Sequence, residues 1–226
     1  MRTGRDPGHA RLSAQSDAFV AQVKAAADDA GLPFGCIAVD GAHIYEDTPE
    51  ARVMNRAIAY RWLDVAETLG ARQVRIDAGG PEAMPDDVFD NIVAGYNDLV
   101  ARGRDKGVEI VMENHWGPSL VPENVVKIIE AVHGLGLLFD THNWADGMQE
   151  KGWAMCARYA RATHIKTFTL TRTATSRRSI FRKPCALLRD AGFDGVWGIE
   201  SVPPEGADEY EGVRKTIALM ERVLHA

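Results

Sequence analysis

Apolar positions along the chain follow two alternating patterns from about residue 16 onward. Short runs of consecutive apolar residues, typical of buried strands, are separated by longer segments in which apolar residues recur at helical spacing. The expected strands cover 34–39, 73–77, 108–113, 135–140, 162–166 and 196–200. The expected helices cover 16–30, 48–69, 85–105, 122–133, 147–159, 184–191 and 208–224. This order predicts parallel βα units.

The expected strands are too uniformly apolar for a sheet with one face in water, so both faces must be covered. Neither a dinucleotide-binding glycine motif nor a Walker-type loop follows any of them, which favours a β/α barrel over a doubly wound sheet. No low-complexity linker divides the chain. We therefore expect residues 1–226 to form a single domain, with 1–15 as an irregular segment.

The composition favours a small-molecule enzyme over a nucleic-acid or membrane protein. A chain of 226 residues, 46% of them hydrophobic, is long enough to bury one core. Its formal charge of −6 argues against general affinity for nucleic acid. No apolar run reaches the roughly 18 residues that a membrane span needs, and 1–15 lack the apolar centre of a secretion signal. Three scattered cysteines fit a reducing compartment, so we expect a cytoplasmic protein.

Four successive expected strands end in a side chain that can bind a metal ion. Glu113, Asp140, His164 and Glu200 occupy these positions, each about one βα unit after the previous one. Because the carboxyl ends of barrel strands meet at one mouth, such groups can surround a single ion. Three carboxylates and one imidazole suit Mn²⁺ or Mg²⁺ best, and Co²⁺ or Zn²⁺ also fit. The pattern therefore predicts one divalent cation bound by these four residues.

The motifs that carry these residues resemble those of the xylose isomerase-like barrels, which include sugar epimerases, hydroxypyruvate isomerases and inosose dehydratases. The similarity covers most of the chain and involves the sequences Glu-Asn-His at 113–115, Phe-Asp-Thr-His-Asn at 139–143, His-Ile-Lys at 164–166 and Gly-Ile-Glu at 198–200. They resemble the family's fifth-, sixth-, seventh- and eighth-strand motifs. The resemblance implies a TIM barrel and a metal-dependent isomerase or epimerase. Its substrate would be a sugar, a sugar phosphate or a related hydroxy-ketone, converted through an enediolate that the metal stabilises.

The resemblance also implies roles for individual residues. Glu113 and Glu200 would act as acid and base on opposite sides of the substrate carbon. The candidates for substrate binding are His115, His142, Asn143, Lys166 and Trp116. Alternatives stay open: His115 can instead hydrogen-bond a carboxylate ligand, Lys166 can balance the acidic cluster, and Trp116 can be a packing residue. The sequence does not decide whether His142 or Asn143 points inward.

Several further positions allow two interpretations. Trp144 is either a pocket wall or a packing residue, and Arg75 and Asp77 either reach the substrate or form a structural ion pair. Ser119 stands where some ketose epimerases carry another acidic substrate contact. A basic group after the strand at 162–166 either binds phosphate or forms a solvated loop: Arg172, Arg177, Arg178, Arg182 and Lys183.

The number of strands departs from a complete barrel, which has eight. Six are expected here, and residues 2–15 are too polar to supply two more. We therefore expect an incomplete barrel with an open seam between 34–39 and 196–200, and low solubility or a homodimer as the consequence. Our hypothesis for this departure is that the gene encodes about 50 further residues upstream, roughly two barrel strands with their connections.

Three other functions compete with isomerisation. The same enediolate chemistry serves a metal-dependent dehydratase of the inosose or dehydroshikimate type. A truncated barrel can also retain a metal site without turnover. A nuclease of the apurinic endonuclease type is disfavoured by the acidic charge and by the lack of extra strand-end histidines.

Overall fold

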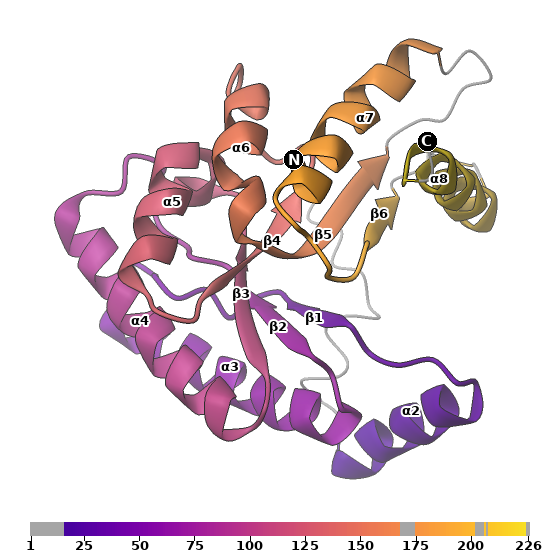
Figure 1. The fold of residues 1–226 in the computed structure, drawn as a ribbon. Helices are drawn as coiled ribbons and strands as arrows, with labels where there is room; N and C mark the ends of the chain where they lie inside the picture. Colours follow the sequence, from indigo (N-terminus) through magenta and orange to yellow (C-terminus); the bar gives the residue numbers. More distant parts are fainter. Residues whose placement is uncertain (1–15, 168–174, 202–205, 207, 225–226) are drawn as a thin grey trace.

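The computed structural model describes residues 16–167, 175–201, 206 and 208–224. Within them, six parallel strands are neighbours in space in the same order as in the sequence. They are β1 Cys36–Val39, β2 Gln73–Ile76, β3 Glu109–Glu113, β4 Gly136–Asp140, β5 Ala160–Thr167 and β6 Ile199–Ser201. The helices cover the outside of this curved sheet (Figure 1). The expected incomplete barrel of six strands is therefore confirmed.

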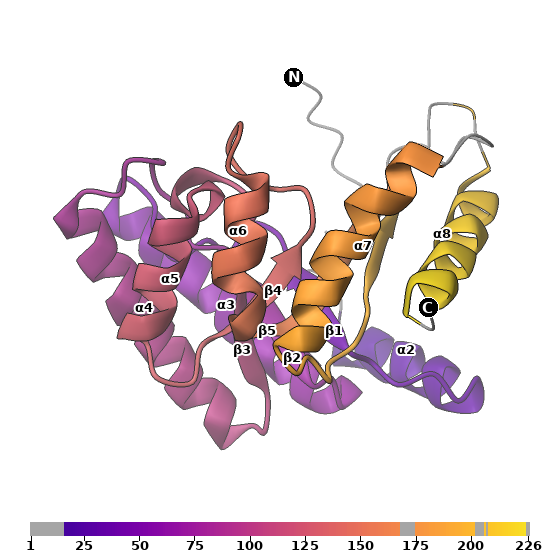
Figure 2. The same cartoon turned by 45° about the horizontal axis from the view of Figure 1, so that its top comes forward.

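Helices connect the strands and lie along the outside of the sheet (Figure 2). Their buried apolar residues belong to the same core clusters as those of the strands. None of the helices in the described residues is long and apolar enough to cross a membrane. They are α2 Asp17–Asp29, α3 Pro49–Leu69, α4 Asp86–Asp105, α5 Pro122–Ala131, α6 Gln149–Cys156, α7 Thr175–Asp190, α8 Glu209–Leu224 and the 3-10 helices η1 Gly117–Leu120 and η2 Ala157–Tyr159. Local sequence signals explain where several helices begin and end. For example, Thr48 Oγ1 accepts a hydrogen bond from the Ala51 amide at the start of α3, and Gly70 ends α3 in the left-handed region.

Helix α7 begins nine residues earlier than expected. We expected the helix to start at Pro184, since proline is favoured in the first helical turn. Pro184 instead lies inside the helix, which begins at Thr175. Phe181, Cys185 and Leu188 are buried at helical spacing across the proline. The packing of this apolar face offsets the backbone hydrogen bond that proline cannot donate.

Alternation along the strands separates the core from the site. Ile110 and Met112 of β3 pack under the helices, whereas Val111 faces the concave side with Leu138 and Ala162. Glu113 follows Val111 by two residues and therefore lies on the same concave face, nearer the carboxyl end of the strand. The same alternation carries the other strand-end residues, so the polar site lies above a small apolar layer.

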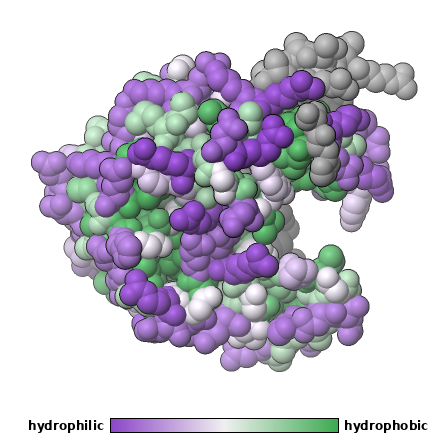
Figure 3. Space-filling view, viewed as in Figure 1, coloured by the Kyte–Doolittle hydropathy of each residue, from purple (hydrophilic) through white to green (hydrophobic). Residues whose placement is uncertain are grey.

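Strands β1 and β6 are the edges of the sheet. Within the described part of the chain, no strand pairing joins them. Their amino-terminal ends nevertheless approach each other, because a Cβ placed on Gly35 would lie 3.5 Å from Cγ2 of Val196. The surface is indented on this side of the molecule, between the regions of α2 and α8 (Figure 3). The seam expected from the sequence is therefore present.

Candidate metal centre

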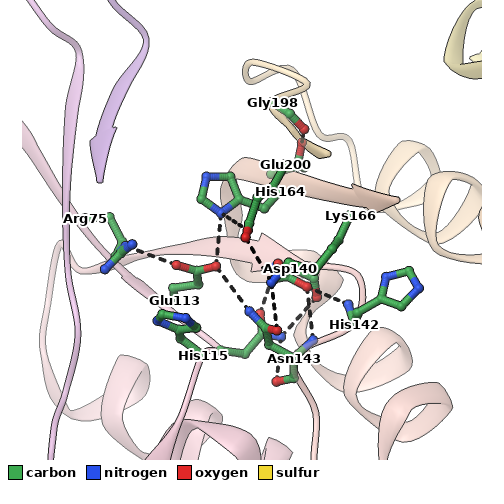
Figure 4. Close-up of polar contacts among 12 residues, drawn as sticks. Arg75, Glu113, His115, Asp140, His142, Asn143, His164, Lys166, Gly198 and Glu200 are labelled. Carbon is green, nitrogen blue, oxygen red and sulfur yellow. Dashed lines mark hydrogen bonds and ion pairs between the residues drawn. The ribbon is translucent and has the colours of Figure 1, made fainter. Parts of the chain in front are cut away.

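The carboxyl ends of β3 to β6 bring Glu113, Asp140, His164 and Glu200 together (Figure 4). One ligand atom from each lies within 4.8 Å of the others. His164 Nδ1 is 3.0 Å from Glu113 Oε1 and 3.2 Å from Glu200 Oε2. Strand register contributes to this convergence, since Asp140 is level with His164 on the adjacent strand. The geometry expected from the four strand ends is thus found.

Two carboxylates of this group carry a buried oxygen without a hydrogen bond. Asp140 Oδ1 accepts hydrogen bonds from the His142 and Asn143 amides at 2.6 and 3.0 Å, but its Oδ2 accepts none. Glu113 Oε2 is likewise buried without a hydrogen bond. Buried oxygens of this kind are costly unless a donor or a cation satisfies them. The side-chain cations of Lys166 and Arg75 approach these two oxygens to 3.3 and 3.0 Å without forming hydrogen bonds. A hard divalent ion such as Mn²⁺ or Mg²⁺ fits the donor set of three carboxylates and one imidazole.

Lys166 places a positive charge inside the acidic cluster. Its Nζ lies 3.3 Å from Asp140 Oδ2 and 3.2 Å from Glu200 Oε1, and it donates a hydrogen bond to Asn143 Oδ1 at 3.0 Å. Burial lowers the pKa of Lys166, but the carboxylates of Asp140 and Glu200 together raise it by more than burial lowers it. The net shift of this pKa is upward. Lys166 therefore stays charged and partly balances the cluster.

The protonation of the cluster follows from burial and from these pairs. Burial raises the pKa of Asp140 to about 6 despite Lys166. Burial alone would lower the pKa of His164, but Glu113 and Glu200 raise it to about 9. For Glu200, burial is outweighed by His164 and Lys166, which lower its pKa to about 2. At neutral pH the imidazole of His164 therefore carries a proton that a bound metal ion would displace.

Arg75 of β2 connects this cluster to a second polar group. Its Nε lies 3.0 Å from Glu113 Oε2, which makes an ion pair without the alignment of a hydrogen bond. Its Nη1 donates to Asp77 Oδ2 at 2.9 Å. The same Asp77 oxygen lies 3.0 Å from Nδ1 of His115. Arg75 and Asp77 thus form a buried ion pair, and His115 contacts Asp77.

The side chain that points into the cluster from the end of β4 is Asn143. Its Nδ2 lies 3.5 Å from Glu113 Oε1, and its Oδ1 accepts the hydrogen bond from Lys166. The ring of His142 points away from the acidic cluster (Figure 4), and its Nδ1 lies 3.0 Å from Thr141 Oγ1. The backbone, not the ring, of His142 contacts Asp140.

The two tryptophans beside the site differ in environment. Trp116 is 36% exposed and meets the ring of His43 edge-on, with 4.6 Å between ring centroids. Trp144 is 7% exposed, packs edge-on against Phe139, and covers Gly152 so closely that a Cβ there would meet the indole ring. Trp144 is therefore a core residue, and its interpretation as a pocket wall is wrong.

Ser119 and the basic group after β5 are the remaining positions for which the sequence allowed two interpretations. Ser119 is buried, and its hydroxyl accepts from the His115 amide and donates to the Trp116 carbonyl, so it shapes the loop after β3. In the basic group, Arg172 and the side chains of Arg177 and Arg178 lie outside the described residues. Arg182 and Lys183 are exposed on α7, and Lys183 pairs with Glu150 of α6.

Asn114 was not identified from the sequence, although it directly follows Glu113. It is fully buried and links the ends of β3 and β4: its Nδ2 donates to the carbonyls of Asp140 and Asn143 at 3.0 and 3.2 Å, and its Oδ1 accepts from the Asp140 amide at 2.9 Å. Its only sequence signal is an amide side chain just after a buried strand. Thr141 was missed as well, and its Oγ1 accepts a hydrogen bond from the Lys166 amide.

Comparison with known proteins agrees with this architecture. The sequence profile of the xylose isomerase-like TIM barrel family matches residues 3–223. No curated protein matches the chain in a sequence search. Among solved structures, the chain resembles 3-keto-D-glucoside 4-epimerase from E. coli with a TM-score of 0.71 and 14% identity over 90% of this chain and 84% of that one.

Two more solved structures are similar to this chain. A xylose isomerase-like TIM barrel protein from Mycobacterium smegmatis, in complex with magnesium, gives a TM-score of 0.69 and 20% identity over 94% of this chain and 81% of that one. D-psicose 3-epimerase in the presence of D-fructose gives a TM-score of 0.70 and 16% identity over 96% of this chain and 88% of that one. At these identities the similarity shows a common fold.

Proposed function

Because the chain belongs to the xylose isomerase-like TIM barrel family, we propose that it is a metal-dependent isomerase or epimerase of a sugar or related hydroxy-ketone. The observation that carries the proposal is the convergence of Glu113, Asp140, His164 and Glu200 at the mouth of the half-barrel. These four residues would hold the ion, Mn²⁺ or Mg²⁺ best matching their chemistry. When bound, the ion supplies Lewis acidity toward a carbonyl and its neighbouring hydroxyl. Sugar epimerases among the similar structures agree with this class of substrate.

Proton transfer falls to Glu113 and Glu200. Both carboxylates contact His164 Nδ1, Glu113 Oε1 at 3.0 Å and Glu200 Oε2 at 3.2 Å (Figure 4). Glu113 is 1% exposed and Glu200 is 39% exposed at the side chain. A substrate entering from solvent therefore reaches Glu200 first. We assign Glu200 as the base that removes the proton next to the carbonyl and Glu113 as its partner on the other face.

The remaining polar groups are suited to orient substrate oxygens. Lys166 and Asn143 lie beside Glu200 and Asp140 and offer a cationic donor and an amide. His115 contacts Asp77, the ion-pair partner of Arg75. Trp116 follows His115 in the chain, and its partly exposed indole is suited to pack against a sugar's C–H face. We assign His142 a supporting role, through its backbone contact with Asp140.

Proton exchange tests the proposal directly. The purified protein, loaded with Mn²⁺ or Mg²⁺, is incubated in D₂O with open-chain ketoses, inososes and hydroxy-ketoacids, and deuterium incorporation is followed by NMR. The expected result is exchange next to the carbonyl of at least one compound, abolished by EDTA and restored by metal. Exchange that persists in EDTA would contradict the proposal. The absence of exchange with every compound in these classes would contradict it as well.

Product analysis separates isomerisation from dehydration in the same samples. An isomerase or epimerase returns a compound of unchanged mass with a new configuration or carbonyl position. A dehydratase instead yields an unsaturated ketone, which absorbs in the ultraviolet.

A further inference from the structure

A second group of metal-binding side chains adjoins the first and shares Glu113 with it. One ligand atom from each of Asp77, Glu113 and His115 lies within 4.8 Å of the others. Asp77 Oδ1 and Glu113 Oε2 are buried and accept no hydrogen bond. By side-chain type alone, two such groups bridged by one carboxylate match a centre for two ions.

The guanidinium of Arg75 lies between the two carboxylates of this second group. Its Nε is 3.0 Å from Glu113 Oε2 and its Nη1 is 2.9 Å from Asp77 Oδ2, while only 6% of the side chain is exposed. Arginine keeps its proton throughout the pH range in which proteins fold. A divalent ion bound by Asp77 and Glu113 would therefore face a fixed positive charge at contact distance.

The charge balance around the site also favours one ion. Four carboxylates and two permanent cations face it: Asp77, Glu113, Asp140, Glu200, Arg75 and Lys166. With neutral histidines their formal charges sum to −2, which one divalent ion cancels. A second would leave +2 in a largely buried space, which is unfavourable. Asp40 also pairs with Arg75, but its side chain is 69% exposed and is screened by solvent.

We propose that Arg75 takes the place of a second metal ion and thereby restricts the centre to one. Arg75 would act through Glu113 as a positioning residue, holding Oε2 so that Oε1 faces His164 and the four-residue site. This inference rests on the proposed function, because it requires a metal ion bound through Glu113.

Metal stoichiometry tests this role without reference to turnover. The metal-free protein is titrated with Mn²⁺ alone; bound ions are counted by calorimetry, and electron paramagnetic resonance detects pairs of coupled ions. Wild-type protein should bind one ion and show no coupled spectrum. Arg75→Met, which removes the charge at similar length, should bind two ions with a coupled spectrum. Arg75→Lys, which keeps the charge, should bind one, and Arg75→Met combined with Asp77→Asn should return to one.

Each outcome supports or overturns the role of Arg75. Two ions in the wild-type protein, or a single ion in the folded Arg75→Met protein, overturn it. If Arg75→Met does not fold by circular dichroism, Arg75→Gln takes its place, and two ions in the wild-type protein would still overturn the role of Arg75. No bound ion in the wild-type protein contradicts the proposed function, and with it this inference, so the two failures are distinguishable.

Discussion

At the scale of single residues, exposure separates the two glutamates of the candidate centre. Glu113 is buried and fixed from two sides, by Arg75 and by His164. Glu200 is half-exposed and pairs with His164 and Lys166 at the surface of the cluster. Proton exchange with substrate and solvent needs access as well as a carboxylate. The proposed base is therefore the residue that solvent already reaches.

Replacing Glu200 by Gln tests this assignment. The amide keeps an oxygen for the metal but cannot take a proton, so deuterium exchange should fall by at least about a hundredfold. Metal affinity, measured by calorimetry, should change much less than the exchange rate. Glu221→Gln on the exposed face of α8 is the matched control and should leave both unchanged. An unaltered exchange rate in Glu200→Gln would assign the base to another residue.

The pH dependence of metal binding follows from His164 and Asp140. A bound ion must displace the proton on His164, whose pKa is raised to about 9, and below pH 6 also the proton on Asp140, whose pKa is about 6. The apparent affinity for Mn²⁺ should therefore rise about tenfold per pH unit between pH 6 and 9, and more steeply below 6. Calorimetry in buffers of different ionisation enthalpy should detect nearly one proton released per ion at pH 7.5. Constant affinity from pH 6 to 9 would exclude His164 as a ligand.

At the scale of elements, the strand ends of the candidate site depend on links between neighbouring strands. Asn114 provides such a link, because its side-chain amide forms hydrogen bonds with both the backbone N–H and the backbone carbonyl of Asp140. It thereby fixes the end of β4 relative to β3. No backbone pairing of β3 and β4 extends this far, since their register ends at Glu113.

Asn114→Ala should destabilise the protein and loosen the centre. The substitution leaves buried backbone groups of Asp140 and Asn143 without partners, at a cost of about 1–3 kcal/mol, which thermal unfolding measures. Metal affinity should fall by roughly tenfold to a hundredfold, because groups that orient a ligand contribute on this scale. The control is Asn124→Ala, which removes an exposed hydrogen bond to Glu82 and should change stability by no more than about 0.5 kcal/mol. Equal effects of the two substitutions would contradict the proposed link.

The sequence predicts most elements because their signals are local. All six strands and the starts of α2 and α3 lie within a few residues of the expected ranges. The start of α7 is not predictable in this way, because Pro184 matches a first-turn signal, yet the helix begins at Thr175 and buries Phe181 before the proline. Strand phase likewise predicts that four side chains meet, but loop conformation decides whether His142 or Asn143 points inward and whether Trp144 is buried.

At the scale of the whole molecule, the sheet is an incomplete barrel of six strands with two open edges. Backbone groups on the outer side of β1 and β6 pair with no strand in the described residues. Apolar side chains are also exposed on the flanking segments, with Leu32 at 66% before β1 and Val196 at 43% before β6. Unpaired edges beside apolar surface favour association with another chain. We therefore propose that the protein self-associates through this seam.

Sedimentation over a range of protein concentrations tests the proposed association. The wild-type protein should shift from monomer to dimer or larger species as its concentration rises. Charges placed beside the seam, in Leu32→Glu combined with Val196→Glu, should weaken the association at least about tenfold, because association would bury uncompensated carboxylates. Lys127→Glu on α5, on the far side of the molecule in Figure 1, changes charge without touching the seam and should leave it unaltered. A protein that stays monomeric at all concentrations would contradict association through the seam. Equal weakening by the Leu32→Glu, Val196→Glu double variant and by Lys127→Glu would place the contact elsewhere.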